Sequence, residues 1–198
     1  GATFATAIYH VFLLFGLGVS YAITPLVAAT SQSDKEGRLI FLQNGMLLNI
    51  LLALIMFFIT LILIPYLSFF GQQSSVTLAA SPYLKIISTS LIPLMIFQTF
   101  RQFSEGQSNT LSPMIVSVLA NLLNVLLNYV FIYGHWGFPK MGLIGAGYAT
   151  LISRFVMVIL MMVLTREMWR GFSGHFDLKV IMRLLRIGVP SGLQYVFE

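Results

Sequence analysis

The chain has 198 residues, of which 58% are hydrophobic and 9% are charged. A typical soluble domain carries about 25% charged residues, so a soluble chain of this composition could not cover its own core. The net charge of +5 comes from basic residues spread between apolar segments, not from an aromatic-interleaved basic patch. We therefore expect no nucleic-acid partner. The chain has no cysteine, so it has no disulfide framework and no thiolate metal site.

Long apolar segments alternate with polar turns along the whole chain. They cover 4–29, 39–70, 82–103, 111–133 and 141–164, and a sixth begins near 188. Each is too long for a strand, and a helix needs about 20 apolar residues to cross a bilayer. Helices are the open-chain structures that satisfy every backbone group in lipid. The sequence predicts an all-α polytopic membrane protein with about five full transmembrane helices and the start of a sixth.

Basic residues are divided unevenly between the turns. The first, third and fifth turns hold eight Lys and Arg residues, whereas the second and fourth hold one, Lys140. Short loops rich in Lys and Arg stay on the cytoplasmic side, so the odd turns are predicted to be cytoplasmic. The Gly1 end then lies on the outer side. This predicts that a missing helix first brings the chain across, and that the chain is a piece of a longer protein.

The stretch 176–188 alternates basic and apolar residues at helical spacing. This pattern fits an interfacial helix lying on the cytoplasmic surface. It fits equally well the basic end of the next spanning helix. The sequence leaves these two interpretations open.

The fourth apolar segment carries three asparagines. Asn121, Asn124 and Asn128 have helical spacing, so they fall on one stripe of the helix. An amide facing lipid is unsatisfied and costly, so the stripe must face other helices or water. One interpretation is packing, with interhelical hydrogen bonds worth about 0.6 kcal/mol each. The other is a cavity for an ion or a substrate, because amide oxygens are hard ligands that suit Na⁺.

The fifth segment opens with small residues, which let helix backbones approach closely: Gly142, Gly145, Ala146, Gly147, Ala149 and Thr150. The turn before it is short, so its expected partner is the asparagine helix. Packing is the commoner reason for such residues. Close packing would also bring the Thr150 hydroxyl toward that helix.

Two ionisable residues are predicted to lie at membrane depth, where charges are rare and mark functional candidates. Arg154 lies inside the fifth segment and Glu198 inside the sixth. Arg154 is a candidate cavity-lining residue together with Asn121; alternatively it snorkels, or pairs with Glu105. The Glu198 carboxyl, in a semi-apolar environment, could exchange a proton near neutral pH. Its alternative role is an ion pair with a basic residue elsewhere in the protein.

Enzyme signatures are absent from the sequence, which contains no His-Glu-x-x-His zinc motif, no Gly-x-Ser-x-Gly elbow and no P-loop. Nothing pairs a nucleophile with a base. The sequence therefore predicts a protein that is not an enzyme and does not itself drive pumping with ATP.

Three runs, "LVAATSQSDKEGR", "NVLLNYVFIYGHWGFPKMGLIGAGYATLISR" and "LLRIGVPSGLQYVFE", together resemble the multidrug and toxic compound extrusion (MATE) family, above all its NorM-type bacterial branch. The resemblance implies a fold of twelve helices in two lobes, of which this chain covers the second helix to the start of the seventh. Residues 1–165 would be the N-lobe bundle without its first helix. Residues 166–187 would be the cytoplasmic linker with an amphipathic helix, and 188–198 the start of the first C-lobe helix.

The resemblance also implies the coupling residues. Asn124 and Asn128 would line a cation or proton site in the N-lobe, joined by Ala146 and Thr150 from the next helix. Glu198 would match the acidic residue of the seventh helix, a cation-coupling position in the C-lobe. No metal is expected apart from Na⁺ at these residues.

The function implied for the whole protein is secondary active efflux of organic cations and amphipathic drugs in exchange for Na⁺ or H⁺, by alternating access. It needs no cofactor besides the coupling ion, and its partners are small-molecule substrates, the lipid bilayer and the rest of the same chain. The expected location is the bacterial inner membrane. Two alternatives are a flippase for lipid-linked oligosaccharides of the same superfamily and a non-transporting membrane scaffold. The flippase should have a more cationic cavity, whereas Arg154 is the only basic residue deep in a predicted span.

Overall fold

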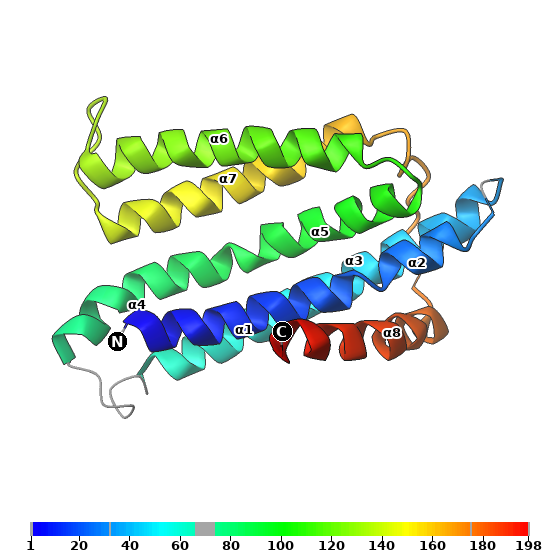
Figure 1. Ribbon diagram of the computed structural model, residues 1–198, viewed down its shortest axis with the longest axis horizontal. Helices are drawn as coiled ribbons and strands as arrows, with labels where there is room; N and C mark the ends of the chain where they lie inside the picture. Colours follow the sequence, from blue (N-terminus) through cyan, green and yellow to red (C-terminus); the bar gives the residue numbers. More distant parts are fainter. Residues whose placement is uncertain (1, 32, 66–73, 175, 198) are drawn as a thin grey trace.

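The computed structural model describes residues 2–31, 33–65, 74–174 and 176–197, and within these ranges it is a bundle of helices without strands. The helices lie roughly along one long axis (Figure 1). In chain order they are α1 (Ala2–Ser20), α2 (Ile23–Ala28), α3 (Lys35–Leu63), α4 (Ser74–Thr89), α5 (Leu91–Gly106), α6 (Leu111–Tyr133), α7 (Leu143–Leu164) and α8 (Leu178–Phe197).

The described residues contain five helices or helix pairs long and apolar enough to cross a membrane. They are Tyr9–Ala28, Lys35–Leu63, Ser81–Gly106, Leu111–Tyr133 and Leu143–Leu164. This confirms the predicted all-α polytopic architecture, and the fourth span coincides with the predicted segment 111–133. The end of the predicted segment 39–70 lies outside the described residues beyond 65.

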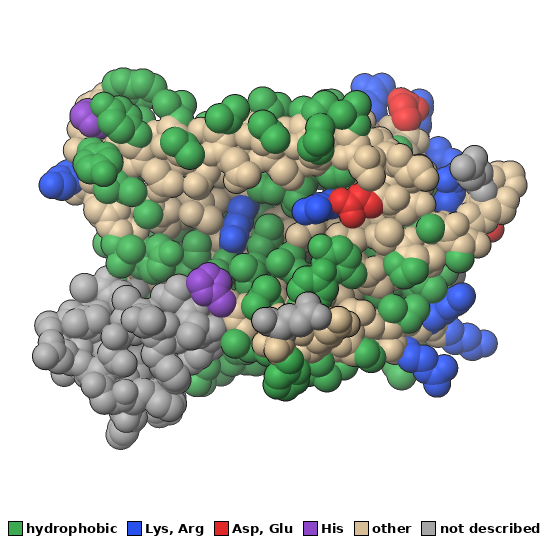
Figure 2. All heavy atoms as spheres, viewed as in Figure 1, with side chains coloured by type: hydrophobic (Ala, Val, Ile, Leu, Met, Phe, Trp, Pro, Cys, Tyr) green, Lys and Arg blue, Asp and Glu red, His purple; other side chains and the backbone are tan. Residues whose placement is uncertain are grey.

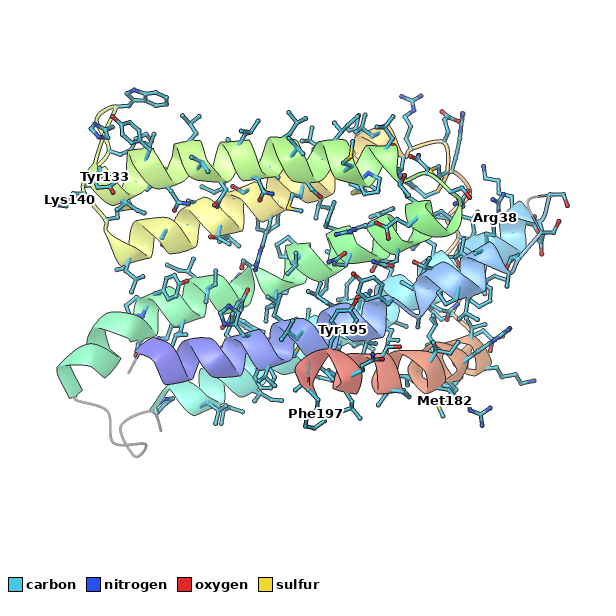
Figure 3. The ribbon with its side chains drawn as sticks, viewed as in Figure 1. Arg38, Tyr133, Lys140, Met182, Tyr195 and Phe197 are labelled. Carbon is cyan, nitrogen blue, oxygen red and sulfur yellow. The ribbon has the colours of Figure 1, made fainter. Side chains whose placement is uncertain are left out.

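The two ends of the bundle differ in charge. Figure 2 shows Lys and Arg side chains gathered at the end where α3, α6 and α8 begin. In Figure 3 the labelled Arg38 lies at this end, whereas Lys140 and Tyr133 lie at the opposite end. The fold thus brings the odd turns to one end, as the alternating path of spanning helices requires. Which end faces the cytoplasm stays a prediction.

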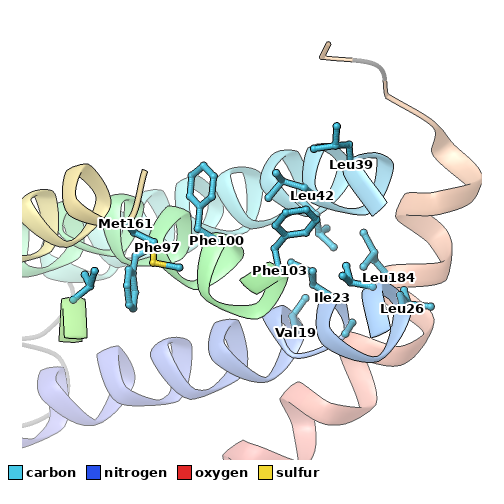
Figure 4. Packing of buried hydrophobic residues seen from close by; sticks show 14 residues of the cluster. Val19, Ile23, Leu26, Leu39, Leu42, Phe97, Phe100, Phe103, Met161 and Leu184 are labelled. Carbon is cyan, nitrogen blue, oxygen red and sulfur yellow. The ribbon is translucent and has the colours of Figure 1, made fainter. Parts of the chain in front are cut away.

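The main core lies between α1, α2, α3 and α5, in the half of the bundle near Arg38. Figure 4 shows its aromatic centre, where Phe97 and Phe103 are each 1% exposed and Phe97 lies beside Met161 of α7. Leu184 of α8 is also fully buried in this cluster. Lipid is as apolar as these side chains, so close packing rather than the hydrophobic effect holds the helices together.

The α6–α7 pair is packed differently from this core. Its outward side exposes large apolar side chains, such as Leu122 and Val125 of α6 and Ile159 of α7. The two helices meet through Gly145, where an added Cβ would lie 2.7 Å from the Phe131 carbonyl oxygen. The pair therefore combines a close glycine contact with an outer face whose composition suits lipid.

The first and third predicted segments are each broken into two helices. Pro25 explains the first break, because its ring would clash with the carbonyl of residue 21, where α1 gives way to α2. The second break falls at Ser90, between α4 and α5, and Pro93 lies in the first turn of α5. Proline at this position is tolerated because a helix start leaves its first N–H groups unbonded.

Two helix ends follow from their capping residues. The Asp34 carboxylate accepts a hydrogen bond of 2.8 Å from the Gly37 N–H at the start of α3. At the end of α6, Gly134 adopts a left-handed φ of +78°, which only glycine takes without strain. Both caps lie in runs that carry the family resemblance.

Helix α8 is continuous across residues 187 and 188, where the sequence suggested a boundary between linker and C-lobe helix. It packs antiparallel along α1 through glycines: a Cβ added at Gly18 would lie 2.4 Å from the Gly192 Cα, and one at Gly188 would lie 2.7 Å from the Val19 carbonyl oxygen. The basic residues of 176–188 and the apolar residues after them thus belong to one helix. The division into lobe, linker and C-lobe helix stays a prediction.

Candidate functional site

The asparagine stripe forms on α6 as the spacing predicts. Asn124 and Asn128 are half-buried, and the Asn128 amide donates a hydrogen bond of 2.9 Å to the Asn124 side-chain oxygen. Asn121 is exposed. Within the described ranges, no hydrogen bond joins any of the three to another helix. The interhelical bonds that the packing interpretation needs are therefore not made by this part of the protein.

The contact at Gly145 sets the register between the antiparallel helices α6 and α7. Gly145 lies against Phe131, and the Met141 N–H also donates to the Phe131 carbonyl, at 2.9 Å. Counting along both helices from this contact places Thr150 level with the turn between Asn124 and Asn128. The residues that the resemblance grouped thus lie at the same depth in the bundle.

Ala146 and Thr150 also lie on the same side of the helix pair as the stripe. On α7, Gly145 faces α6, whereas Gly147 packs against Tyr83 and Ile86 of α4. At 100° per residue, Ala146 and Thr150 lie between these two directions, on the side opposite the exposed Tyr148. For antiparallel right-handed helices this is the side to which the α6 stripe turns. The Thr150 hydroxyl donates to the Ala146 carbonyl, at 3.0 Å, and keeps its oxygen available as an acceptor.

Arg154 lies one turn from Thr150 on the same face of α7. Its Nη1 donates two hydrogen bonds, of 2.7 Å to the Tyr9 hydroxyl of α1 and 2.6 Å to the Ser90 hydroxyl at the break between α4 and α5. Ser90 is fully buried and Tyr9 is 5% exposed. The guanidinium therefore joins three parts of the bundle near the middle of α7.

The predicted alternative partner of Arg154 is wrong. Glu105 pairs with Arg101 on its own helix, at 2.7 Å, one turn apart. Arg154 does not snorkel to the charged end either, because its hydrogen bonds hold it in the bundle interior. Figure 2 shows the surface hollowed between the α6–α7 pair and the helices beside it.

Sequence reasoning missed Tyr9 and Ser90 as partners of Arg154. A signal for Ser90 exists: the run Ser88–Ser90 precedes Pro93 inside an apolar segment, which is a composition that favours a break. Tyr9 carries no such signal, because it lies 145 residues from Arg154. Its role depends on how α1 is placed in the bundle by α3, α4, α5 and α8.

Glu198 lies outside the described residues, so its place relative to the other candidates is not assigned. The last described residue of α8 is Phe197, which Figure 3 labels. Elsewhere in the described ranges, no group of three or more His, Cys, Asp or Glu side chains could hold a metal ion. Hard oxygen ligands in the candidate site come from amides and a hydroxyl instead.

The protein-family model described as MatE matches residues 1–130. The chain belongs to the MatE family. This match includes the whole of α1 to α5 and most of α6 with its asparagine stripe. It confirms the family resemblance that the sequence runs indicated.

Relatives extend the match to nearly the whole chain. The multidrug resistance protein NorM of Photobacterium profundum is 31% identical over 98% of this chain and 44% of its own length. The multidrug resistance protein MdtK of Pectobacterium atrosepticum is also 31% identical, over the same shares. The chain thus spans less than half the length of the curated relatives it matches.

Solved MATE structures share the fold. A multidrug resistance MATE family transporter in an inward-facing conformation aligns with a TM-score of 0.73 at 23% identity, over 98% of this chain and 44% of that one. The eukaryotic MATE transporter AtDTX14 aligns with a TM-score of 0.79 at 17% identity, over 99% and 44%. The helices therefore have the arrangement of part of a MATE-type transporter.

Proposed function

We propose that the full-length protein is a secondary transporter that exports organic cations and other amphipathic drugs in exchange for Na⁺ or H⁺. The observation that carries this proposal is a cluster of polar side chains on the face of the α6–α7 pair that includes Ala146 and Thr150. Asn124, Asn128 and Thr150 lie at one depth in the bundle, in helices that otherwise expose apolar side chains. The relatives are multidrug resistance proteins by name, which supports the same function.

The chemistry of this group suits a small cation. Amide and hydroxyl oxygens bind Na⁺ without needing a charged ligand. In this proposal Glu198, which follows Phe197 in the sequence, supplies a carboxylate that either binds the cation or takes up a proton. Because drug and coupling ion favour opposite states of the transporter, binding of one weakens binding of the other by the same factor. The ion gradient then drives drug outward.

Alternating access requires helix groups that keep their arrangement while the cavity changes sides. The fold of this chain aligns with a MATE transporter described as inward-facing at a TM-score of 0.73, and with one described as outward-facing at 0.74. A group of helices that keeps its arrangement in both states would support the proposed alternating access. In the proposed topology, the basic end of the bundle faces the cytoplasm of a bacterial inner membrane.

The test is efflux of a fluorescent cationic dye by the full-length protein in everted vesicles, under an imposed Na⁺ or pH gradient. We expect gradient-driven dye movement in the wild type and its loss in Glu198→Gln. The control is Glu105→Gln, because Glu105 is a carboxylate already paired within α5. This control should keep transport.

The gradient that moves the dye identifies the coupling ion. If neither gradient moves the dye, although the protein is inserted and folded, the proposal is wrong, and a flippase or a scaffold becomes the better interpretation. If Glu105→Gln abolishes transport as strongly as Glu198→Gln, the assigned role of Glu198 is wrong.

A further inference from the structure

Arg154 uses only one edge of its guanidinium within the described part of the chain. Both of its hydrogen bonds leave from Nη1, to Tyr9 and Ser90. Nε and Nη2 have no partner among the described residues. A guanidinium offers five N–H donors in a rigid plane, and two parallel N–H bonds along one edge match the two oxygens of a carboxylate. Anchoring by Nη1 therefore fixes the plane and leaves a donor edge for a second group.

The charge of Arg154 is not neutralised by its neighbours. Its two partners are neutral hydroxyls, and within the described ranges no carboxylate forms an ion pair with Arg154. Arg101 shows the contrast, because it has its own carboxylate one turn away in Glu105. A cation in the middle of a spanning helix normally has a charged partner or marks a functional site.

The position of Arg154 also affects cation binding by the neighbouring cluster of Asn124, Asn128 and Thr150. Arg154 and Thr150 are four residues apart on one face of α7, so their Cβ atoms are about 6 Å apart. In the weakly polarisable interior of a membrane protein, the Arg154 guanidinium would repel a cation held beside Thr150. A cation beside Thr150 and the asparagines would therefore bind poorly while Arg154 remains uncompensated. A carboxylate on the free edge of Arg154 would remove this repulsion.

We propose that the free edge of Arg154, oriented by Tyr9 and Ser90, binds a carboxylate group that accompanies the cation bound at Asn124, Asn128 and Thr150. This inference rests on the proposed transport function and adds a ligand chemistry to its site. The ligand class is a carboxylate held by two N–H donors. Its source is either a zwitterionic amphiphile that carries an amine and a carboxylate, or an acidic side chain of the full-length protein.

A matched pair of dyes separates these sources. One is a zwitterionic rhodamine with a free carboxylate, and the other is its methyl ester, which keeps the cationic ring system. Binding of each dye to the purified full-length protein is measured by fluorescence polarisation at several pH values. The variants are Arg154→Gln and, as control, Arg101→Gln, which removes an arginine that already has a carboxylate partner.

If the substrate supplies the carboxylate, the wild type binds the free acid more tightly than the ester. Arg154→Gln then weakens binding of the acid by about tenfold or more and does not weaken binding of the ester, because the variant removes a charge that repels the cationic ring. If a side chain of the protein supplies it, the wild type binds both dyes alike. Removing the arginine then raises the pKa of that carboxyl group, so dye binding is lost at higher pH on acidification in Arg154→Gln. Arg101→Gln should change neither quantity.

The inference is overturned if Arg154→Gln folds and binds the dyes but changes neither the acid-to-ester ratio nor the pH dependence. Failure of the proposed function looks different, because then neither dye binds the wild type. If Arg154→Gln does not fold, Tyr9→Phe serves instead, since it removes one anchor and keeps the charge. Tyr9→Phe should reduce the acid-to-ester binding ratio, or shift the pH dependence of dye binding, by a smaller factor than Arg154→Gln. If neither the ratio nor the pH dependence changes, the proposal is contradicted.

Discussion

Asparagines of the spanning helices occur in two settings, and their environments differ. In the α3–α5 core, Asn49 is 1% exposed and donates to the Thr99 hydroxyl at 2.8 Å. Asn44 is fully buried and accepts at 2.8 Å from the Asp177 N–H, in the segment that leads into α8. On α6, in contrast, Asn124 and Asn128 are half-buried, and within the described ranges their side chains hydrogen-bond only to each other. Core asparagines are thus satisfied across the fold, whereas the α6 stripe has capacity left for a ligand.

This contrast separates structural from functional amides better than position in the membrane does. Both settings lie within candidate spans. What differs is where the hydrogen-bond partners come from, because a buried amide in a packed core must find its partners in neighbouring helices. An amide that keeps an unused acceptor on the inner side of the bundle is available for an ion or a substrate.

The largest expected effect comes from breaking the contact that positions the stripe. In Gly145→Ala the new Cβ would lie 2.7 Å from the Phe131 carbonyl oxygen, so the α6 and α7 backbones must separate. We expect a loss of about 2–3 kcal/mol in the free energy of unfolding. Denaturation of the full-length protein in detergent measures this loss.

The matched control is Gly147→Ala on the same helix. Its new Cβ would meet side chains of α4 instead of backbone, Ile86 Cγ2 at 3.2 Å and a Tyr83 ring carbon at 3.3 Å, and a shift of a few tenths of an ångström relieves both contacts. Alanine is also the better helix former, so stability should change little. Equal destabilisation by both variants would show that the Gly145 contact with α6 is no closer than the Gly147 contact with α4.

A smaller effect is expected from Asn49→Ala in the core. It removes the hydrogen bond to Thr99, whose hydroxyl still donates to the Met95 carbonyl at 2.9 Å. We expect a loss of about 1 kcal/mol in unfolding free energy, with drug transport per folded molecule unchanged. If the free energy of unfolding does not change, the Asn49 side chain does not stabilise the core as the comparison assumes.

The smallest effect is expected at the charged end of the bundle. A hydrogen bond from Arg170 lowers the pKa of the Glu167 carboxyl below its ordinary value. The carboxylate is therefore fully ionised at neutral pH, and its ion pairs are lost only as the pH falls through that lowered pKa. Glu167 is exposed, so Glu167→Gln should leave the thermal midpoint at pH 7 unchanged within error. A measurable fall would show that this ion-pair cluster is structural.

The sequence predicts the spanning helices well because their signal is local. Helix α6 follows from a long, mostly apolar run without charged residues that ends before Gly134, and the stripe follows from the spacing of its asparagines. The short turn between α6 and α7 makes their antiparallel packing predictable too. These features depend on residues close together in the chain.

The features that the sequence does not predict depend on packing between distant segments. Pro93 permits a break at Ser90, but membrane helices tolerate proline, so the residue alone does not decide it. One alternative that the sequence left open for Arg154 was an ion pair with Glu105. The structure instead provides hydroxyls from α1 and the α4–α5 break, because the register of α7 brings them to its middle.

The central claim is that the α6 asparagines serve transport and the α3 asparagine serves stability. The most direct test measures thermal midpoint and gradient-driven dye efflux per folded molecule for Asn124→Ala, Asn128→Ala and Asn49→Ala of the full-length protein. We predict that the two α6 variants lose efflux by about tenfold or more with little change in midpoint, whereas Asn49→Ala lowers the midpoint and keeps efflux. If the α6 variants lower the midpoint as much as Asn49→Ala and transport normally, their role is packing and the claim is wrong.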